Sequence, residues 1–243
     1  MNIFLPAQSS IKNMKISVAL AAYKGEQYIA EQIESILSQL GENDELIVSD
    51  DFPSGKTRTV IETLSSQDKR IIYIEGPGKG VIKNFENALK ACSGDVIFLS
   101  DQDDVWLPGK VEAVMNEFRN GAKLVLHDAS ITDADLHITA PSCFEVHGAN
   151  ASFKSNLIKN TFVGCCMAFT KELLEQTMPF PEGIAMHDWW IALIALKNKQ
   201  KTVLLKKPLI LWRRHGDNVT GGKTSAVQKI KWRLNMLLSL ARI

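Results

Sequence analysis

Strand-like and helix-like segments alternate over the first hundred residues, and this alternation limits the possible folds more than any other feature of the sequence. Three stretches have apolar residues at three- and four-residue steps, which predicts helices over 28–40, 56–66 and 80–92. Short apolar runs precede and follow them: "KISVALAAY", "ELIVSDD", "RIIYIE" and "DVIFLSDQDD". Units of this length predict a parallel sheet covered by helices, with right-handed crossovers. The first run has too few polar residues for a half-exposed strand, so we expect helices on both faces.

The second half of the chain is less regular. We expect a strand over 123–133, a loop over 148–156, and a strand running into a helix over 161–176. "HDWWIALIALKNK" predicts a helix that begins at His187 and Asp188 and is too apolar on all sides to lie on the surface. One or two further strands are expected over 202–218.

Composition limits the class of protein. With 243 residues and 45% hydrophobic content, the chain has enough material for a large core. The formal net charge of +1 argues against nucleic acid as a partner, because attraction to anions must then come from local patches. The cysteines show no CxxC spacing, and we interpret them as buried free thiols in a reducing cytoplasm. They are Cys92, Cys143, Cys165 and Cys166.

The two ends of the chain differ in character. Residues 1–14 lack a basic segment and a long apolar core, so we expect a loose lead-in rather than a signal peptide. No run approaches the roughly 20 apolar residues that span a bilayer. Residues 223–243 predict a basic amphipathic helix, which either rests on a membrane surface or packs on its own domain. Its apolar positions are Ile230, Leu234, Leu237 and Ala241, and its basic flanks are Lys229, Lys231, Arg233 and Arg242.

Acidic residues gather where the predicted strands end. The first strand ends at Ala22–Tyr23, the second at Asp50–Asp51 and the fourth at Asp101–Asp103. Because ligands of parallel sheets bind at the carboxyl ends of strands, these groups are expected on one edge. A single Asp often serves a turn, but two acidic clusters on one edge favour a site for a hard divalent cation. The neighbouring Asp104 either joins that site or caps the next turn.

Five motifs in order resemble those of family 2 glycosyltransferases of the GT-A type. They are "VALAAYKGEQYIAEQIESILSQ", "VSDDFPSGKT", "SDQDDVWLPGK", "GCCMAFTKELL" and "HDWW". The resemblance covers about residues 15–220, and together with "LWRRHGDNVTG" it is strongest to the rhamnosyltransferase-like branch that builds bacterial surface polysaccharides. Phe52 and Pro53 depart from the usual Gly-Ser. Because proline fixes φ and lacks an N–H, the loop near the nucleotide base is expected to have a different shape.

The resemblance implies an α/β GT-A fold with a mostly parallel central sheet flanked by helices. It implies one catalytic domain over 15–222, with a nucleotide-sugar-binding half at 15–106 and an acceptor half at 107–222. The implied activity is inverting, metal-dependent transfer from dTDP-rhamnose or a UDP-hexose to a hydroxyl of a growing glycan. A lipid-linked O-antigen or capsule precursor, met in the cytoplasm at the inner face of the membrane, is the implied acceptor.

The same resemblance assigns roles to single residues. Asp103 would bind Mn²⁺ or Mg²⁺, and His215 would complete the metal sphere or touch the diphosphate. Asp188 would be the catalytic base, although an Asp at the start of a helix is otherwise an N-cap. The implied donor-binding residues are Ala22, Tyr23, Asp51, Lys83, Asp101, Gln102, Arg213 and Arg214. The implied acceptor residues are His187, Trp189 and Trp190, although Tyr23 and both tryptophans could instead fill a core.

Two other functions fit parts of the sequence. Residues 101–105, "DQDDV", match the nucleophile motif of haloacid dehalogenase-type phosphohydrolases, in which Asp101 would be phosphorylated. That motif usually follows the first strand of its domain, whereas here three strand–helix units precede it. A noncatalytic module that binds sugar nucleotides would keep the fold without turnover. The presence of Asp101, Asp103 and Asp188 together argues against it.

Overall fold

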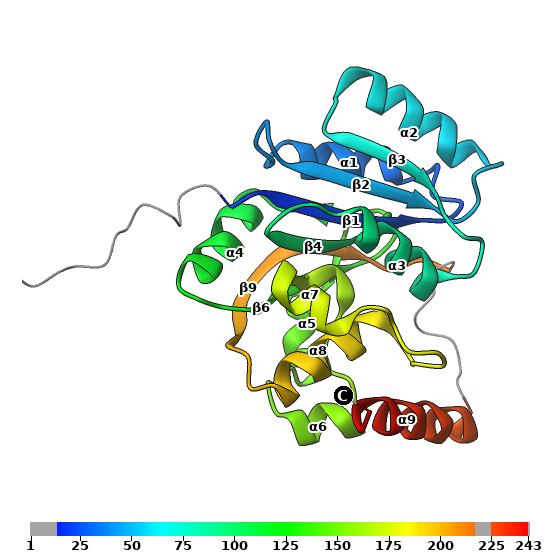
Figure 1. Ribbon diagram of the computed structural model, residues 1–243. Coiled ribbons are helices and arrows are strands. Elements are labelled where there is room, and N and C mark those ends of the chain that lie inside the picture. The colour runs from blue at the N-terminus through cyan, green and yellow to red at the C-terminus, as the bar shows by residue number, and fades with distance from the viewer. Residues whose placement is uncertain (1–13, 217–224, 243) are drawn as a thin grey trace, which may run out of the picture.

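The computed structural model describes residues 14–216 and 225–242 (Figure 1). The predicted lead-in and the expected boundary at 222–223 therefore lie almost wholly outside the described residues. The elements in chain order are β1 (Ile16–Ala22), α1 (Ile29–Leu37), β2 (Glu45–Asp50), α2 (Lys56–Gln67), β3 (Ile71–Glu75), α3 (Val81–Ala91), β4 (Val96–Asp101), β5 (Val105–Trp106), α4 (Lys110–Arg119), β6 (Leu124–Thr132), β7 (Ile138–Ala140), α5 (Cys143–His147), α6 (Phe153–Ile158), the 3₁₀ turn η1 (Gly164–Cys166), β8 (Met167–Thr170), α7 (Lys171–Thr177), α8 (His187–Lys197), β9 (Thr202–Arg213) and α9 (Ala226–Leu240).

The strands form one sheet with the order β3-β2-β1-β4-β8-β6-β9-β5, and β7 pairs with β6. The four strands of the regular first half pair in parallel, which confirms the predicted alternation of strands and helices. The sheet turns mixed at β8, which runs antiparallel to both β4 and β6. β6 and β9 are parallel, and the short β5 pairs antiparallel with β9. One continuous sheet therefore joins the two halves.

The register brings the acidic strand ends together. Ala22 of β1 pairs with Asp50 of β2, and Ala21 pairs with Asp101 of β4. Because parallel strands share a direction, their carboxyl ends lie at one edge of the sheet. The sequence prediction that these ends converge is confirmed.

Two apolar clusters cover the two faces of the sheet. On β1, Val18 and Leu20 face the cluster that includes α1 and α4, and Ala19 faces the cluster that includes α3 and α8. All three are fully buried, so β1 is covered on both faces as predicted. Helix α8 is buried from His187 through Ala195, which agrees with its apolar composition on all sides.

The less regular second half departs from expectation in two places. The predicted loop at 148–156 contains the start of α6, whose N-cap Ser152 accepts a hydrogen bond from the Ser155 backbone. The strand expected from 161 begins only at Met167, because the chain first makes the η1 turn. Elements of three to six residues are too short to show an apolar period, so the sequence pattern did not reveal them.

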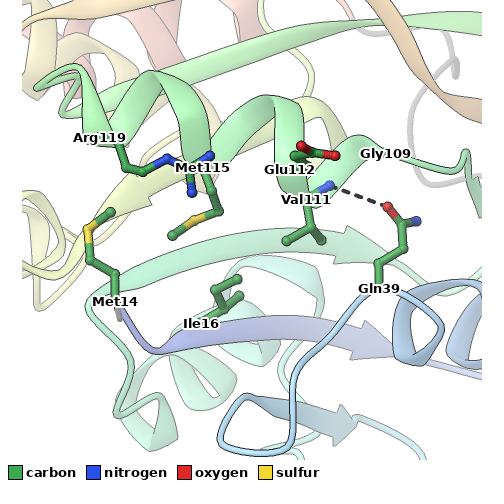
Figure 2. Close-up of a pocket in the computed structure, with 8 residues that line it drawn as sticks. All are labelled: Met14, Ile16, Gln39, Gly109, Val111, Glu112, Met115 and Arg119. Atoms are coloured by element: carbon green, nitrogen blue, oxygen red, sulfur yellow. Dashed lines mark hydrogen bonds between the residues drawn. The ribbon is translucent and has the colours of Figure 1, made fainter. Parts of the chain in front are cut away.

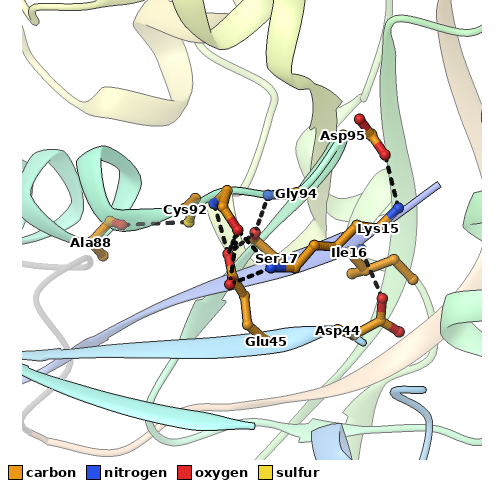
Figure 3. Close-up of polar contacts among 10 residues, drawn as sticks. Lys15, Ile16, Ser17, Asp44, Glu45, Ala88, Cys92, Gly94 and Asp95 are labelled. Carbon is orange, nitrogen blue, oxygen red and sulfur yellow. Dashed lines mark hydrogen bonds and ion pairs between the residues drawn. The ribbon is translucent and has the colours of Figure 1, made fainter. Parts of the chain in front are cut away.

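A polar network fastens the opposite, amino-terminal end of the sheet (Figure 3). The buried Glu45 carboxylate accepts hydrogen bonds from Lys15 Nζ at 2.8 Å, Ser17 Oγ at 2.6 Å and the Ser93 backbone at 2.7 Å. Burial raises the pKa of Glu45, but these bonds outweigh burial and leave the pKa below its ordinary value. The network ties β1 to β2 and to the turn that leads into β4.

The four cysteines are free thiols, as predicted; Cys143, Cys165 and Cys166 are buried, whereas Cys92 is only half-buried. Among the described residues, no helix has both the length and the apolar character needed to cross a bilayer. The C-terminal segment forms α9, as expected, and Met236 and Leu240 on this helix are buried against the cluster that includes α8.

Candidate active site

A pocket of about 490 Å³ opens at the carboxyl ends of β1 and β4, between these ends and the start of α8. Most of the residues singled out from the sequence line it. They are Ala22, Tyr23, Asp51, Asp101, Gln102, Asp103, His187, Asp188 and Arg214. These residues lie up to 192 positions apart in the chain, so the pocket is a product of the tertiary fold.

A second cavity of about 410 Å³ lies near the opposite end of β1, between its start and α4 (Figure 2). Met14, Ile16 and Met115 line it, and Gln39 closes one side by accepting a hydrogen bond from the Val111 backbone. No residue singled out from the sequence contributes to this cavity, so the site is sought in the first pocket.

Gln102 fixes the loop that follows β1. Its side chain accepts a hydrogen bond from the Tyr23 backbone N–H at 2.8 Å and donates one to the Tyr23 carbonyl at 2.9 Å. Gly25 leaves room for this arrangement, since a Cβ there would collide with the Gln102 side chain. Tyr23 itself is 52% exposed, so the alternative that it fills a core is wrong. Its ring meets Phe52 edge-on at 5.9 Å, so Phe52 supports the aromatic ring that lines the pocket.

Asp51 shapes the neighbouring wall. One carboxylate oxygen accepts from the Gly78 N–H and the other from the Gly80 N–H, each at 2.7 Å. Both glycines have positive φ, 65° and 84°, a conformation that strains residues with a Cβ. The carboxylate and the two glycines thus hold the turn before α3 against the pocket.

Asn84 was missed in the sequence. It lies on the buried face of α3 and donates to the Ala22 carbonyl at 3.0 Å and the Ser49 carbonyl at 2.9 Å, while the Ser49 hydroxyl donates to its oxygen at 2.6 Å. Asn84 thereby joins the ends of β1 and β2 beneath the pocket. A polar residue between the apolar positions Val81 and Phe85 of one helix was the available signal.

The predicted metal ligands lie together. His215 Nε2 is 2.8 Å from Asp103 Oδ2, and each side chain is 13% exposed. Asp103 lines the pocket, with its oxygen beside an imidazole nitrogen. Carboxylate oxygen and imidazole nitrogen are donors that Mn²⁺ accepts, and Mg²⁺ accepts the oxygen. The residues present therefore fit a divalent cation.

Asp104 lies deeper than Asp103. Its Oδ1 accepts from the distant Arg213 backbone N–H at 3.1 Å, and its buried Oδ2 has no partner within the described part of the chain. This makes Asp104 a link to β9 rather than a cap on the next turn. Ligand atoms of Asp101, Asp104 and Cys165 lie within 4.8 Å of one another. Burial, reinforced by the other acids, raises the pKa of Asp104 to about 7 and that of Asp101 well above its ordinary value.

The positive charge of the buried Lys110 balances part of the negative charge of these carboxylates. Lys110 is 1% exposed, its Nζ donates to the Cys165 carbonyl at 3.2 Å, and the same atom is 3.7 Å from the Trp106 ring centroid. Burial lowers the pKa of Lys110 to about 8. Sequence reasoning missed Lys110, although its four-residue spacing from Val114 placed it on a buried helix face.

Asp188 lies in the first turn of α8, not at its N-cap, which is Met186. Its Oδ1 accepts from the Trp189 backbone N–H at 2.6 Å. Burial raises the pKa of Asp188 to about 6, although hydrogen bonds from the Trp189 and Gly164 backbones act to lower it. Such a pKa suits a group that must take up a proton near neutral pH.

His187 precedes Asp188 and lines the same pocket. Its ring stacks on Phe85 with centroids 4.0 Å apart, and both ring nitrogens are buried without a partner in the described structure. Burial lowers the pKa of His187 to about 3, so the ring is neutral at physiological pH. A neutral imidazole next to Asp188 offers one donor and one acceptor to a bound hydroxyl.

Trp189 and Trp190 do not face the pocket, which corrects the expectation that they stack on an acceptor. They are 7% and 2% exposed, and their indole N–H groups donate to the Asn156 and Thr177 carbonyls at 2.7 and 3.0 Å. Both side chains belong to the core cluster behind α8, as large aromatics usually do.

Arg213 and Lys83 also differ from expectation, because neither lines the pocket. The Arg213 guanidinium is buried and donates to the Asp103 carbonyl at 2.8 Å and to Glu31 at 2.5 Å. Lys83 pairs with Glu86 at 2.8 Å and Glu182 at 3.3 Å. Arg213 therefore positions the segment that carries Asp103, and of the two adjacent arginines only Arg214 lines the site.

Known proteins are similar to this chain in sequence and in fold. The family model of glycosyl transferase family 2 matches residues 17–178. The dTDP-rhamnosyl transferase RfbG of Shigella flexneri is 26% identical over 228 residues, covering 87% of this chain and 77% of its own. A second relative, the UDP-Glc:alpha-D-GlcNAc-diphosphoundecaprenol beta-1,3-glucosyltransferase WfgD of Escherichia coli, is 28% identical over 191 residues, or 75% and 70% of the two chains.

A solved structure of S. aureus TarS 1-349 in complex with UDP-GlcNAc superposes with a TM-score of 0.68 at 17% identity. The match covers 87% of this chain but only 62% of that one, so this chain spans less than two thirds of the TarS fragment. At this identity the likeness concerns the fold, and it confirms the predicted GT-A class. With the family match over most of its length, the chain belongs to glycosyl transferase family 2.

Proposed function

We propose that this chain transfers a sugar from a nucleotide-diphosphate sugar to a hydroxyl of a bacterial surface glycan, with inversion at the anomeric carbon. One observation carries the proposal: a single pocket gathers Asp51, Asp103 and Asp188 from three distant segments. The names of the two relatives, a dTDP-rhamnosyl and a UDP-glucosyl transferase, support dTDP-rhamnose or a UDP-hexose as the donor.

The donor would lie along the carboxyl ends of β1 and β4. Tyr23 and the turn held by Asp51 would flank the nucleotide base, and Asp101 would face the ribose. Arg214 lines the same pocket and would meet phosphate oxygens, which a guanidinium binds in a planar fork. The aromatic contact between Tyr23 and Phe52 gives the base an apolar surface, in a loop where the family usually has Gly-Ser.

A divalent cation, Mn²⁺ or Mg²⁺, would be held by Asp103 and His215. When bound it supplies positive charge against the diphosphate that leaves the sugar. Arg213 donates a hydrogen bond to the Asp103 carbonyl, and the positive charge of Lys110 balances part of the negative charge of the neighbouring carboxylates. These two buried side chains would therefore keep the segment with the metal ligand Asp103 in place.

Asp188 would act on the acceptor. Its carboxylate takes the proton of the acceptor hydroxyl as that oxygen bonds to the anomeric carbon. The bond from this carbon to the diphosphate oxygen breaks, and the diphosphate leaves with the electron pair. Attack from the face opposite the leaving group inverts the anomeric centre without a covalent sugar–enzyme intermediate. His187 would hold a neighbouring hydroxyl through its unpartnered nitrogens.

The acceptor proposed here is a lipid-linked glycan precursor. The printed name of the E. coli relative specifies a diphosphoundecaprenol-linked acceptor, and that supports the assignment. Met186 and Val163 line the pocket together with Asp188, and the acceptor sugar would lie along them.

The test separates donor binding from transfer. Purified wild type is screened against nucleotide sugars by thermal shift with and without Mn²⁺, because a ligand of the native state raises Tm by mass action. With the donor so found, transfer is measured for Asp188→Ala, Asp103→Ala and the exposed control Asp135→Asn. Asp188→Ala is expected to bind donor but lose transfer by 10²- to 10⁴-fold. Asp103→Ala is expected to lose the Mn²⁺-dependent part of donor binding.

Three results would contradict the proposal. Normal transfer by Asp188→Ala, with Asp135→Asn also normal, would remove Asp188 as the base. Donor binding by wild type with no transfer to any lipid-linked or free glycan would favour a noncatalytic module. Phosphate release from simple phosphomonoesters that depends on Asp101 would instead favour a phosphohydrolase.

A further inference from the structure

Helix α9 carries a row of exposed apolar side chains. We name Val227, Ile230, Leu234, Leu237 and Leu238 the apolar stripe; their exposed fractions run from 45% to 77%. Eleven large hydrophobic side chains are exposed in the described part of the chain, and nearly half of them lie on this one helix. Scattered exposed hydrophobics are ordinary, but a contiguous row marks a contact surface.

The apolar stripe is not the face by which α9 packs on the protein. At about 100° per residue, the stripe covers an arc of about 100°. Met236 and Leu240 are buried, and Trp232 is partly buried, on the other side of the helix. The two faces are centred about 150° apart by the same spacing. One side of α9 therefore packs on the core while the other presents an apolar surface to solvent.

Polar contacts hold α9 in this orientation. Lys197 at the end of α8 donates from Nζ to the Leu240 carbonyl at 2.7 Å, and the Asn235 amide donates to the Gly183 carbonyl at 3.0 Å. Figure 1 shows α9 in red at the margin of the molecule, on the same side as α8. The stripe is thus fixed in direction relative to α8, whose first turn contains Asp188.

Basic residues border the apolar stripe. Residues 225–243 contain Lys229, Lys231, Arg233 and Arg242 and no acidic residue. By helical spacing, Lys231 and Arg242 lie along one edge of the stripe and Arg233 lies along the other. This arrangement complements a surface that is apolar inside and negatively charged at its boundary, as an anionic lipid bilayer is. Two copies packed stripe to stripe would instead bring basic edges together, which is unfavourable.

We propose that α9 lies in the plane of an anionic lipid surface, with the apolar stripe in the boundary between headgroups and acyl chains and the basic edges against lipid phosphates. Because a hydrogen bond from Lys197 joins α8 to α9, lipid binding by α9 would hold the half of the protein that contains Asp188 at the membrane. Delivery of a lipid-linked acceptor to Asp188 rests on the proposed function, whereas lipid binding itself does not.

The experiment uses the full chain and sedimentation with phosphatidylglycerol-containing vesicles or vesicles of phosphatidylcholine alone. Wild type is expected to bind the anionic vesicles and to be released as salt rises. Leu234→Glu/Leu237→Glu is expected to weaken binding at least tenfold, and each of Lys231→Gln and Arg242→Gln about fivefold. Ile138→Glu/Ile158→Glu places the same charges on similarly exposed positions elsewhere and is expected to bind as wild type does.

Circular dichroism and Tm verify that each variant is folded before binding is compared. The proposal is overturned if folded wild type ignores anionic vesicles, or if the stripe variant and the control pair bind them equally. Light scattering gives a further decisive result: a dimer of wild type that the stripe variant abolishes, without vesicle binding, assigns the surface to a second copy. None of these readouts depends on glycosyl transfer, so failure here leaves the proposed function standing.

Discussion

Asp188 shows how one buried position changes the chemistry of a common residue. On the surface a carboxyl group has a pKa near 3.8, but burial at the start of α8 raises that of Asp188 to about 6. A base must be ionised to accept a proton. The proposed activity therefore falls as pH drops through about 6, well above the range in which an exposed aspartate is titrated.

This pH dependence is the prediction at the residue scale. We expect kcat/KM for transfer to rise tenfold per pH unit below about 6 and to level off above it, measured at saturating Mn²⁺. Donor binding, followed by thermal shift at the same pH values, provides the control, since Asp188 is not assigned to the donor. A plateau that continues to pH 4.5 would show that another group accepts the proton.

Single residues also mark where the sequence was informative. The place of Asp51 and Asp103 at strand ends followed from the apolar pattern, whereas the role expected for Asp188 came from the resemblance of "HDWW" to the family motif. The sequence did not tell buried polar residues from functional ones: Arg213 was expected to bind the donor and instead holds a backbone carbonyl. Lys110 escaped notice because its partners, Cys165 and Trp106, meet it only in the folded chain.

At the scale of elements, the turn before α3 depends on backbone conformation rather than on packing. Gly80 has φ of 84°, and a Cβ there would meet nothing within 4 Å. The same holds for Gly121 after α4, at φ of 86°, which is not among the pocket-lining residues. The two glycines therefore form a matched pair for separating strain from function.

We predict that Gly80→Ala and Gly121→Ala each destabilise the protein by about 1–3 kcal/mol, because alanine is strained at positive φ. Only Gly80→Ala is expected to weaken donor binding, by several-fold, because it disturbs the hydrogen bond that the Gly80 N–H donates to Asp51. Urea unfolding and thermal shift with donor measure the two effects. Equal donor affinity in both variants would mean that this turn does not shape the donor site.

The periodic elements were the ones that sequence alone could predict. The succession from β1 to β4 followed from alternating short apolar runs and helical periods, and α8 followed from its apolar composition. The antiparallel strand β8 and helix α6 could not be predicted in this way. Segments this short show no clear apolar period, and the place of β8 depends on pairing with the distant strands β4 and β6. The core role of Trp189 and Trp190 was left open for a different reason: the apolar composition of α8 predicted a buried helix but not which of its residues line the pocket.

For the molecule as a whole, the network around Glu45 fastens the end of the sheet that is opposite the pocket. Since hydrogen bonds hold the folded pKa of Glu45 below its ordinary 4.5, the ionised form stabilises the fold. This contribution is complete above pH 4.5 and is lost as pH falls through the lowered folded pKa. Acid should therefore loosen this end of the sheet.

We predict that Glu45→Gln lowers the free energy of unfolding by about 2 kcal/mol at pH 7, because the buried donors lose a charged acceptor. The difference in unfolding free energy from wild type should shrink as pH falls below 4.5. There Glu45 becomes protonated first in the unfolded chain and then, at lower pH, in the folded protein. Denaturant unfolding at a series of pH values measures this, with the exposed Glu34→Gln as control. A difference that stays constant down to pH 3 would show that the ionisation of Glu45 does not contribute.

The position of β9 in the sheet has a consequence for synthesis on the ribosome. This late strand lies between β6 and β5, and its last residue, Arg213, holds the backbone of Asp103, which was translated 110 residues earlier. A nascent chain of which only the first half has left the ribosome therefore has Asp51 and Asp103, but neither Asp188 nor the support from β9. Catalytic competence would be acquired abruptly, after β9 has emerged, so incomplete translation products would not consume nucleotide sugars.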